Sequence, residues 1–361
     1  MTTVHDGEPG AVATTASRPR GAHPLLTFLA KRVGITAGLL LGVTVVTFGL
    51  VNVVPGDPVT ANLSDQALND PAAVAAFRQK WGLDQPLWAQ YLHYLGNLLH
   101  GDLGLSQQTG RAVLDDLLHY VPATLELAIP SMVLALLIGT GIGMLAAVRN
   151  GRLTDQLVRI GALLGLSTPP FWLSLVVLYV FFYQLGLAPS GGRLSTDFSP
   201  PPTVTGMYTV DAALAGQWDV AWDAAQHLSL PVLVLTSLTV AMLVRFVRSA
   251  MLEVLQQDYI RAAYAKGLPT RVVLRRHLLR AGLVPVVTVS GLAFASLLSG
   301  TVLVESIFGW PGVGQYAYRS ATALDLPSIL GVSLFVALVY TLVNLTVDLL
   351  YGLIDPRIRL S

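Results

Sequence analysis

The 361-residue sequence contains no cysteine, which excludes disulfides, thiolate metal sites, iron–sulfur clusters and a cysteine nucleophile. Charged residues are also scarce, because they make up 12% of the chain compared with about 25% of an average soluble domain. Hydrophobic residues make up 53%. So few charged residues cannot form the water-exposed surface of a soluble globular protein. The composition therefore predicts an integral membrane protein.

The motifs of several enzyme classes are missing as well. None of the three lysines, Lys31, Lys80 and Lys266, follows a glycine, as the lysine of a phosphate-binding P-loop must. The sequence has neither an HExxH zinc pair nor a GxSxG nucleophile elbow. We therefore expect a protein that is not an enzyme and that holds no ATP, metal or other cofactor on this chain.

Apolar runs of about 20 residues, the length that crosses a bilayer as a helix, occur six times. The sequence thus predicts an all-α membrane protein with six transmembrane helices. Pro169 and Pro170 predict a kink within the third helix. The expected spans are Val33 to Val54, Ala123 to Val148, Leu157 to Leu185, Leu228 to Met251, Leu283 to Glu305 and Ser328 to Ile354.

The distribution of basic residues predicts the orientation of these spans. With a cytoplasmic amino terminus, 17 of the 22 lysines and arginines fall in the inside segments. The positive-inside rule then places both termini in the cytoplasm. Residues 1–32, which contain few bulky apolar side chains, are expected to be a disordered tail, and residues 355–361 a cytoplasmic carboxyl terminus. The first run, 33–54, is too long for a signal-peptide core and is expected to remain as an anchor.

An outside segment, 55–122, contains its own helix boundaries. Asp70 followed by Pro71 predicts an N-cap and first turn, and Gly82 predicts the end of that helix. Pro86 predicts the start of a second helix, which continues to Leu99. A small helical cap on the outer face follows from this pattern.

Within the expected spans, small residues are regularly spaced and ionisable residues are rare. Gly34, Gly38 and Gly42 recur every four residues, a spacing that permits close helix packing, either within this chain or against another. Glu126 and Glu305 lie near outer ends, where structural hydrogen bonding and direct substrate contact are both possible roles. An ion-coupled transporter would hold carboxylates near the bilayer midplane, so the energy for transport is expected to come from another subunit.

The longest inside loop, 252–281, predicts a helix–turn–helix. Gly267 suits a left-handed turn after a helix, and Pro269 suits the first turn of the next. Ala262 and Ala263 leave one side of the first helix with little bulk, so that it can fit a groove of a partner protein. Attraction of the basic residues to anionic lipid is an equally weighted alternative.

The segment RAAYAKG, beginning at Arg261, resembles the EAA motif of ABC importer permeases, although arginine replaces the usual glutamate and Arg280 stands where a proline is usual. Further segments, in order along the chain, are similar to the dipeptide, oligopeptide and nickel permease branch of that family. They are VPGDP from Val54, GLDQPLWAQYLHYLGNLLHGDLGLS from Gly82, LSTPPFW from Leu166, DYIRAAYAKGL from Asp258, ESIFGWPGVG from Glu305 and DPRIR from Asp355.

The resemblance implies a type I importer permease with a five-helix core over residues 123–354. It implies assembly with a homologous second permease, two cytoplasmic ATPases that carry ATP and Mg²⁺, and an extracytoplasmic substrate-binding protein in a bacterial inner membrane. The residues implied to couple the chain to an ATPase are Tyr259, Arg261, Ala262, Ala263, Lys266 and Gly267.

The function expected from this resemblance is import of short peptides by alternating access. Nickel chelates or saccharides are alternative cargoes for the same machinery. In a different class, a channel or secondary transporter that needs no ATPase is the alternative.

Overall fold

The structure is a computed structural model that describes residues 24–53, 57, 59–60, 63–106, 108–323 and 325–354. In these residues regular structure is helical, apart from one isolated β-bridge between Leu105 and Ala112. Five helices are long and apolar enough to cross a membrane, and a bent helix pair makes a sixth candidate. The prediction of an all-α membrane fold is confirmed, and the six predicted spans correspond to five such helices and one bent pair.

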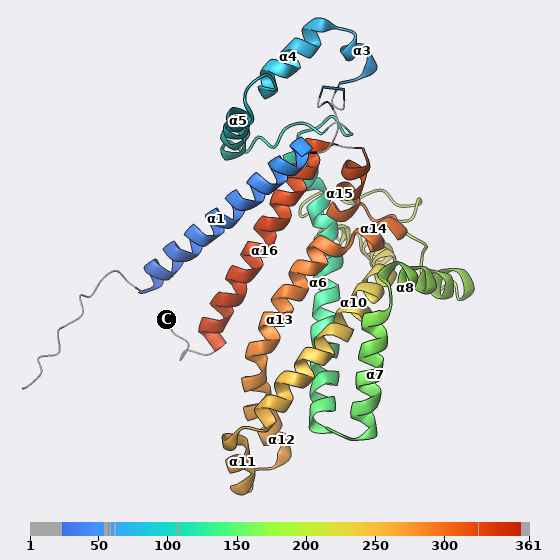
Figure 1. Ribbon diagram of the computed structural model, residues 1–361. Helices are drawn as coiled ribbons and strands as arrows, with labels where there is room; N and C mark the ends of the chain where they lie inside the picture. Colours follow the sequence, from blue (N-terminus) through green and yellow to red (C-terminus); the bar gives the residue numbers. More distant parts are fainter. Residues whose placement is uncertain are drawn as a thin grey trace, which may run out of the picture.

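The first span, α1 (Pro24–Val53), begins nine residues before the predicted start. Residues 24–32 were expected to belong to the disordered tail, and this boundary was wrong because Pro24 occupies the first helical position and strong helix formers follow it. The rest of the expected tail, 1–23, and the carboxyl terminus, 355–361, lie outside the described residues. In Figure 1, α1 runs beside α16 (Leu326–Ile354) at one edge of the bundle.

The outer segment forms the two predicted helices, α4 (Pro71–Trp81) and α5 (Leu87–Leu99), and a short helix, α3 (Asp65–Leu68), that was not predicted. Asp70 accepts a hydrogen bond from the amide of Ala72, and Gly82 ends α4 with a φ of 61°. Figure 1 shows the three helices together at one end of the bundle, which we call the cap end.

The centre of the bundle is α10 (Trp218–Leu255), which packs mainly against α6 (Val113–Val148) and α13 (Leu279–Gly300). α6 begins ten residues before the predicted start at Ala123, because the helix passes through Pro122 without ending. Glycines permit the close approach of α6 to α10: a Cβ atom at Gly139 would lie 2.9 Å from the Cβ of Leu243, and one at Gly143 would lie 2.8 Å from the Cβ of Val247.

The third expected span is broken rather than kinked. α7 (Leu153–Ser167) is followed by α8 (Pro170–Val177) and the π-helical η1 (Leu178–Gln184), and the two parts meet at an angle of 101°. Thr168 and Pro169 have extended backbones, since a residue before proline is driven out of the helical region. The predicted single crossing therefore changes direction at the proline pair.

The remaining elements lie at the two ends of the bundle. α9 (Tyr208–Leu214), α14 (Val302–Ile307) and α15 (Val313–Thr322) belong to the cap end, whereas α11 (Asp258–Ala265), α12 (Thr270–Val272) and the π-helical η2 (Val273–Leu278) form the opposite end. We call this opposite end the basic end because of its arginines; Figure 1 shows α11 and α12 there, far from α4 and α5.

Candidate coupling surface and buried polar network

The helix–turn–helix predicted for the basic end is present as α11, a turn and α12. The turn is closed by hydrogen bonds from the Gly267 amide to the Tyr264 carbonyl (2.9 Å) and from the Leu268 amide to the Ala263 carbonyl (3.3 Å). Gly267 has a φ of 76°, a left-handed conformation that glycine adopts without steric cost. Pro269 directly precedes α12 and so ends the turn.

One side of α11 is buried within the chain itself. Ile260 and Ala263 are 1% and 6% exposed, and they form a cluster with Val273 of η2. Our expectation that Ala263 faces a partner was therefore wrong, because the turn folds that side of α11 onto η2. Ala262 is exposed, as expected for a contact residue.

The other side of α11 presents aromatic and basic side chains to the surroundings. We call it the coupling surface, and its residues are Tyr259, Arg261, Ala262, Tyr264, Lys266 and Leu268, all of them exposed. Arg261 lies 3.7 Å from Asp258 in a solvent-exposed ion pair, an arrangement that contributes little to stability. The sequence did not single out Tyr264 or Leu268, which the turn at Gly267 brings onto this surface. Such a surface can bind another protein.

Within the part of the chain that the structure describes, the regularly spaced glycines of the first span have no close neighbour. A Cβ atom built at Gly34, Gly38 or Gly42 would meet nothing within 4 Å in the described residues. The side chains around them on α1 are exposed as well, for example Leu39 at 57%. The prediction that these glycines pack against a helix thus remains a prediction for another chain.

At the cap end, Glu305 joins α6, α14 and α15. Its Oε1 accepts hydrogen bonds from the hydroxyls of Thr124 (2.9 Å) and Thr301 (2.7 Å), and its Oε2 accepts one from the Gln315 amide (2.8 Å). A Cβ atom at Gly312 would collide with this carboxylate. The glycine of the WPG segment is thus required because the backbone turns tightly around a buried, fully hydrogen-bonded carboxylate.

A second buried carboxylate, Glu126 of α6, holds the loop between η1 and α10. The Nη2 of Arg193 lies 2.6 Å from Glu126 Oε2, and the amide and hydroxyl of Thr209 donate to Oε1 at 2.7 and 2.8 Å. Arg193 also donates to the Gly206 carbonyl, and its guanidinium lies 3.6 Å from the centre of the Tyr208 ring. Both Glu126 and Glu305 therefore have structural hydrogen-bond partners, which supports the structural role over direct substrate contact.

Ser195 of the same loop forms, with Asp223 and His227 of α10, a Ser–His–Asp cluster that sequence spacing did not reveal. The hydroxyl of Ser195 donates to Asp223 Oδ1 (2.6 Å). The Oγ of Ser195 also lies 3.2 Å from Nε2 of His227. The Nδ1 of His227 points to the Gly191 carbonyl (2.9 Å) rather than to the carboxylate. A catalytic triad needs the histidine between serine and carboxylate, so this arrangement fixes the loop and does not generate a nucleophile.

Two further buried acids connect the outer segment to α15 and α16. The Tyr316 hydroxyl lies 2.8 Å from Ser328 Oγ and 3.2 Å from Asp116, while Asp325 accepts hydrogen bonds from Ser106 (2.7 Å) and Ser328 (2.8 Å). Burial is the main cause that raises the pKa of Tyr316 to about 12, so this hydroxyl remains protonated and able to donate. The network thereby ties residues 106–116 to the beginning of α16.

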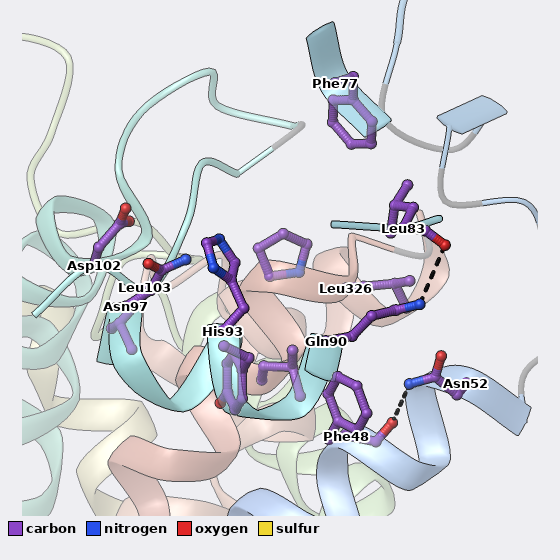
Figure 2. Close-up of a pocket in the computed structure, with 13 residues that line it drawn as sticks. Phe48, Asn52, Phe77, Leu83, Gln90, His93, Asn97, Asp102, Leu103 and Leu326 are labelled. Carbon is purple, nitrogen blue, oxygen red and sulfur yellow. Dashed lines mark hydrogen bonds between the residues drawn. The ribbon is translucent and has the colours of Figure 1, made fainter. Parts of the chain in front are cut away.

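Two cavities lie near these elements. A cavity of about 130 Å³ separates α5 from the ends of α1 and α16; Figure 2 shows Phe48, His93 and Leu326 around it. A second cavity, of about 170 Å³, lies between α8, α10, α13 and α14. Its wall is mainly apolar, with hydroxyl groups from Thr239, Ser296 and Thr301. This second cavity lies between helices of the core.

Comparison with known proteins gives consistent matches over nearly the whole chain. The family model described as "Binding-protein-dependent transport system inner membrane component" matches residues 139–360, and the model of the N-terminal part of such components matches residues 25–128. The probable D,D-dipeptide transport system permease protein DdpB of Escherichia coli is 48% identical over 324 residues, which cover 89% of this chain and 95% of that protein.

Two dipeptide transport system permease proteins named DppB are also similar. The Escherichia coli protein is 40% identical over 339 residues, covering 93% of this chain and 99% of that protein. The protein from Alkalihalophilus pseudofirmus is 39% identical over 335 residues, covering 93% of this chain and all of its own length. With its apolar helices and these matches, the chain belongs to the family of inner membrane components of binding-protein-dependent transport systems.

Proposed function

We propose that the chain is one permease subunit of an ATP-driven importer of short peptides. The observation that carries this proposal is the 48% identity to a D,D-dipeptide permease over 95% of that protein's length. The two DppB relatives, which match almost end to end, give the same substrate class. Dipeptides and oligopeptides are thus favoured over nickel chelates and saccharides.

The partners that we propose are a homologous second permease, two cytoplasmic ATPase subunits and an extracytoplasmic binding protein. The coupling surface of α11 is the proposed contact with an ATPase, since it exposes Tyr259 and Tyr264 beside the cations Arg261 and Lys266. Exposed aromatic and arginine side chains are enriched where proteins bind one another. ATP and Mg²⁺ would be held by the ATPases, and the outer segment would face the binding protein.

The packing of α11 supplies a route by which an ATPase can move the permease. Ile260 and Ala263 contact Val273, with Val254 and Leu255 packed on the same cluster, so α11 is joined to the end of α10 and to η2, which continues directly into α13. A displacement of α11 is therefore transmitted to two core helices rather than absorbed by a loose loop. These two helices also line the 170 Å³ cavity, which is our candidate for part of the peptide path.

Uptake by the assembled transporter tests the proposed function. The chain is co-expressed with its cognate partners and reconstituted in liposomes, and ATP-dependent accumulation of a radiolabelled dipeptide is measured beside a nickel chelate and a disaccharide. We expect uptake of the dipeptide alone, and only in the presence of ATP and binding protein. Accumulation or exchange by the purified chain without partners would overturn the importer assignment in favour of a channel or secondary transporter.

Two neighbouring alanines give a sharper test of the coupling surface. Ala262→Trp adds bulk to an exposed position and should weaken retention of the ATPase and lower transport, while the permease remains folded. Under the lipid-surface alternative the same change is tolerated, since tryptophan favours the membrane interface. Ala263→Trp is the internal comparison: it overfills the buried cluster at a cost of about 1–3 kcal/mol and should disorder the loop itself. Normal ATPase retention with Ala262→Trp would contradict this contact.

Gly267 offers a backbone test of the same contact. Gly267→Val places a β-branched residue at a φ of 76°, where a side chain is strained, although the space around the position is open. We expect an inserted permease in which substrate-stimulated ATPase activity and transport both fall. Gly216→Val, at a φ of 72° in the cap end, is the matched control and should leave ATPase binding unchanged.

A further inference from the structure

A groove runs between α7 and α10 at the basic end of the bundle. It has a volume of about 270 Å³ and is separate from both the coupling surface and the cavities described above. Three arginines line it, Arg159 from α7 with Arg245 and Arg248 from α10. The rest of its wall is mostly apolar. The coupling route proposed above does not include this groove.

The arginines outnumber the acidic groups that neutralise them. Asp155 forms a two-pronged ion pair with Arg248, in which Nε lies 2.5 Å from Oδ1 and Nη2 lies 2.9 Å from Oδ2. Arg159 is 3.9 Å from the same carboxylate, and its side chain is 53% exposed. Arg245 is exposed and lies over the ring of Phe246, with no ion pair to any carboxylate among the described residues. One carboxylate therefore serves two of the three guanidinium groups, and the third, on Arg245, has no carboxylate partner in the described residues.

Charge and apolar surface are arranged along one face of α7. Ala162, Leu163 and Leu166 follow Arg159 by three, four and seven residues, the spacing that places them on the same side of a helix. Leu163 is 59% exposed and Leu166 is 41% exposed. At 1.5 Å per residue the apolar wall extends roughly 10 Å from the arginine toward the bilayer interior. The groove thus has a polar end at the arginines and an apolar end that extends toward the interior of the bilayer.

We propose that this groove binds an anionic phospholipid. Its phosphate would lie between Arg159 and Arg245, and an acyl chain would lie along Ala162, Leu163 and Leu166. Guanidinium groups form paired, charge-assisted hydrogen bonds with phosphate, and basic pockets between membrane helices bind acidic head groups. Arg248 is already paired with Asp155, so it fixes the polar end of the groove and does not bind the phosphate.

The lipid would connect α7 to α10 on the side away from the coupling helix. These helices are already closely packed, because a Cβ atom at Gly165 would lie 2.7 Å from the Cβ of Ala241. A molecule that fills the groove next to this contact stabilises one relative position of the two helices. The permease would then depend on the lipid composition of its membrane.

Lipid retention by the purified complex tests the proposal. Phosphatidylglycerol is titrated onto the delipidated complex, with zwitterionic phosphatidylcholine, whose net charge is zero, as the comparison, and bound lipid is counted by native mass spectrometry. Each arginine near an acidic head group contributes about five-fold in affinity, so Arg159→Gln with Arg245→Gln should weaken phosphatidylglycerol binding about 25-fold. Arg280→Gln is the charge control, because Arg280 is exposed at the basic end of α13 but does not line the groove.

Shape is tested separately from charge. Ala162→Phe fills the apolar wall without changing any charge and should also reduce phosphatidylglycerol binding, whereas Leu164→Phe, on the exposed side of α7, should not. Equal losses in Arg280→Gln and the double variant would overturn the site in favour of general surface attraction. Loss of the second permease from the double variant would instead show a protein in the groove, and unchanged lipid binding would also refute the proposal. None of these outcomes depends on the peptide being transported.

Discussion

Removing the guanidinium of Arg193 should release the loop that covers the cap end. The side chains of Arg193 and Glu126 are 7% and 2% exposed, and their charged atoms are 2.6 Å apart. Arg193→Met leaves the Glu126 carboxylate buried with its hydrogen bonds from Thr209 but without a counter-ion. Breaking a buried pair in this way costs about 3–5 kcal/mol, which raises the population of the open loop by about 100-fold to 5,000-fold.

Limited proteolysis measures that opening directly. Chymotrypsin cleaves after Phe198, which lies in the same loop. When the loop opens and closes faster than the protease cuts, the cleavage rate is proportional to the fraction of molecules with an open loop. We expect the cleavage rate at Phe198 to rise at least 100-fold relative to a site outside the loop. In the double variant Arg193→Met with Glu126→Gln, neither member of the pair carries a charge. Most of the protection of the loop against cleavage should therefore return. A wild-type rate in the single variant, or no recovery in the double variant, would refute the role assigned to this pair.

Three further outcomes are expected. Gly143→Val should lower stability by about 1–3 kcal/mol in thermal unfolding, because its side chain meets Val247, whereas Gly38→Val faces open space and should change it by less than about 0.5 kcal/mol. Burial opposes ionisation of Asp211, yet hydrogen bonds led by those from Thr205 lower its pKa below the ordinary value. The stability that ionised Asp211 gives to the folded loop is fully present above the unfolded-state pKa of about 3.9 and is lost as the pH falls through the lower folded-state pKa. Pepsin cleavage near residue 205, normalised to cleavage at another site, should therefore accelerate on acidification. Cysteine at the exposed Ser199 should label from outside the cell and cysteine at Thr270 only after permeabilisation; outside labelling at Thr270 would contradict the predicted orientation.

The features that could be predicted from the sequence depend on chemistry within a few residues. Asp70 caps α4, and Gly82 and Gly267 end helices with a positive φ, because each role is determined by the backbone next to the residue. The proline pair also indicated where the third span departs from a straight helix, although it was expected to cause a kink rather than a break. Its angle of 101° could not be predicted, since this depends on how α7 and α8 pack against α10.

The residues that escaped prediction are those whose partners lie far along the chain. Arg193 and Glu126 are 67 positions apart, and Thr124 and Glu305 are 181 apart. No periodicity within one helix reveals such pairs. The inward direction of Ala263 was missed for a related reason: α11 has only eight residues, and its buried side is decided by contact with Val273 after the turn.

The two ends of the bundle differ in how the chain neutralises its own charges. At the cap end, Glu126 and Glu305 are buried and satisfied by groups from several elements, so the outer surface is held as one unit. At the basic end, exposed cations such as Arg245 and Lys266 have no carboxylate partner among the described residues, and the charge there remains available to other molecules. In the proposed importer, an ATPase would bind the exposed basic end, and its movement would reach an outer surface that is held as one unit. The broken third span reaches the basic end through α7. In our proposal, a lipid bound in the α7–α10 groove would therefore affect how movement passes from the basic end to the rest of the bundle.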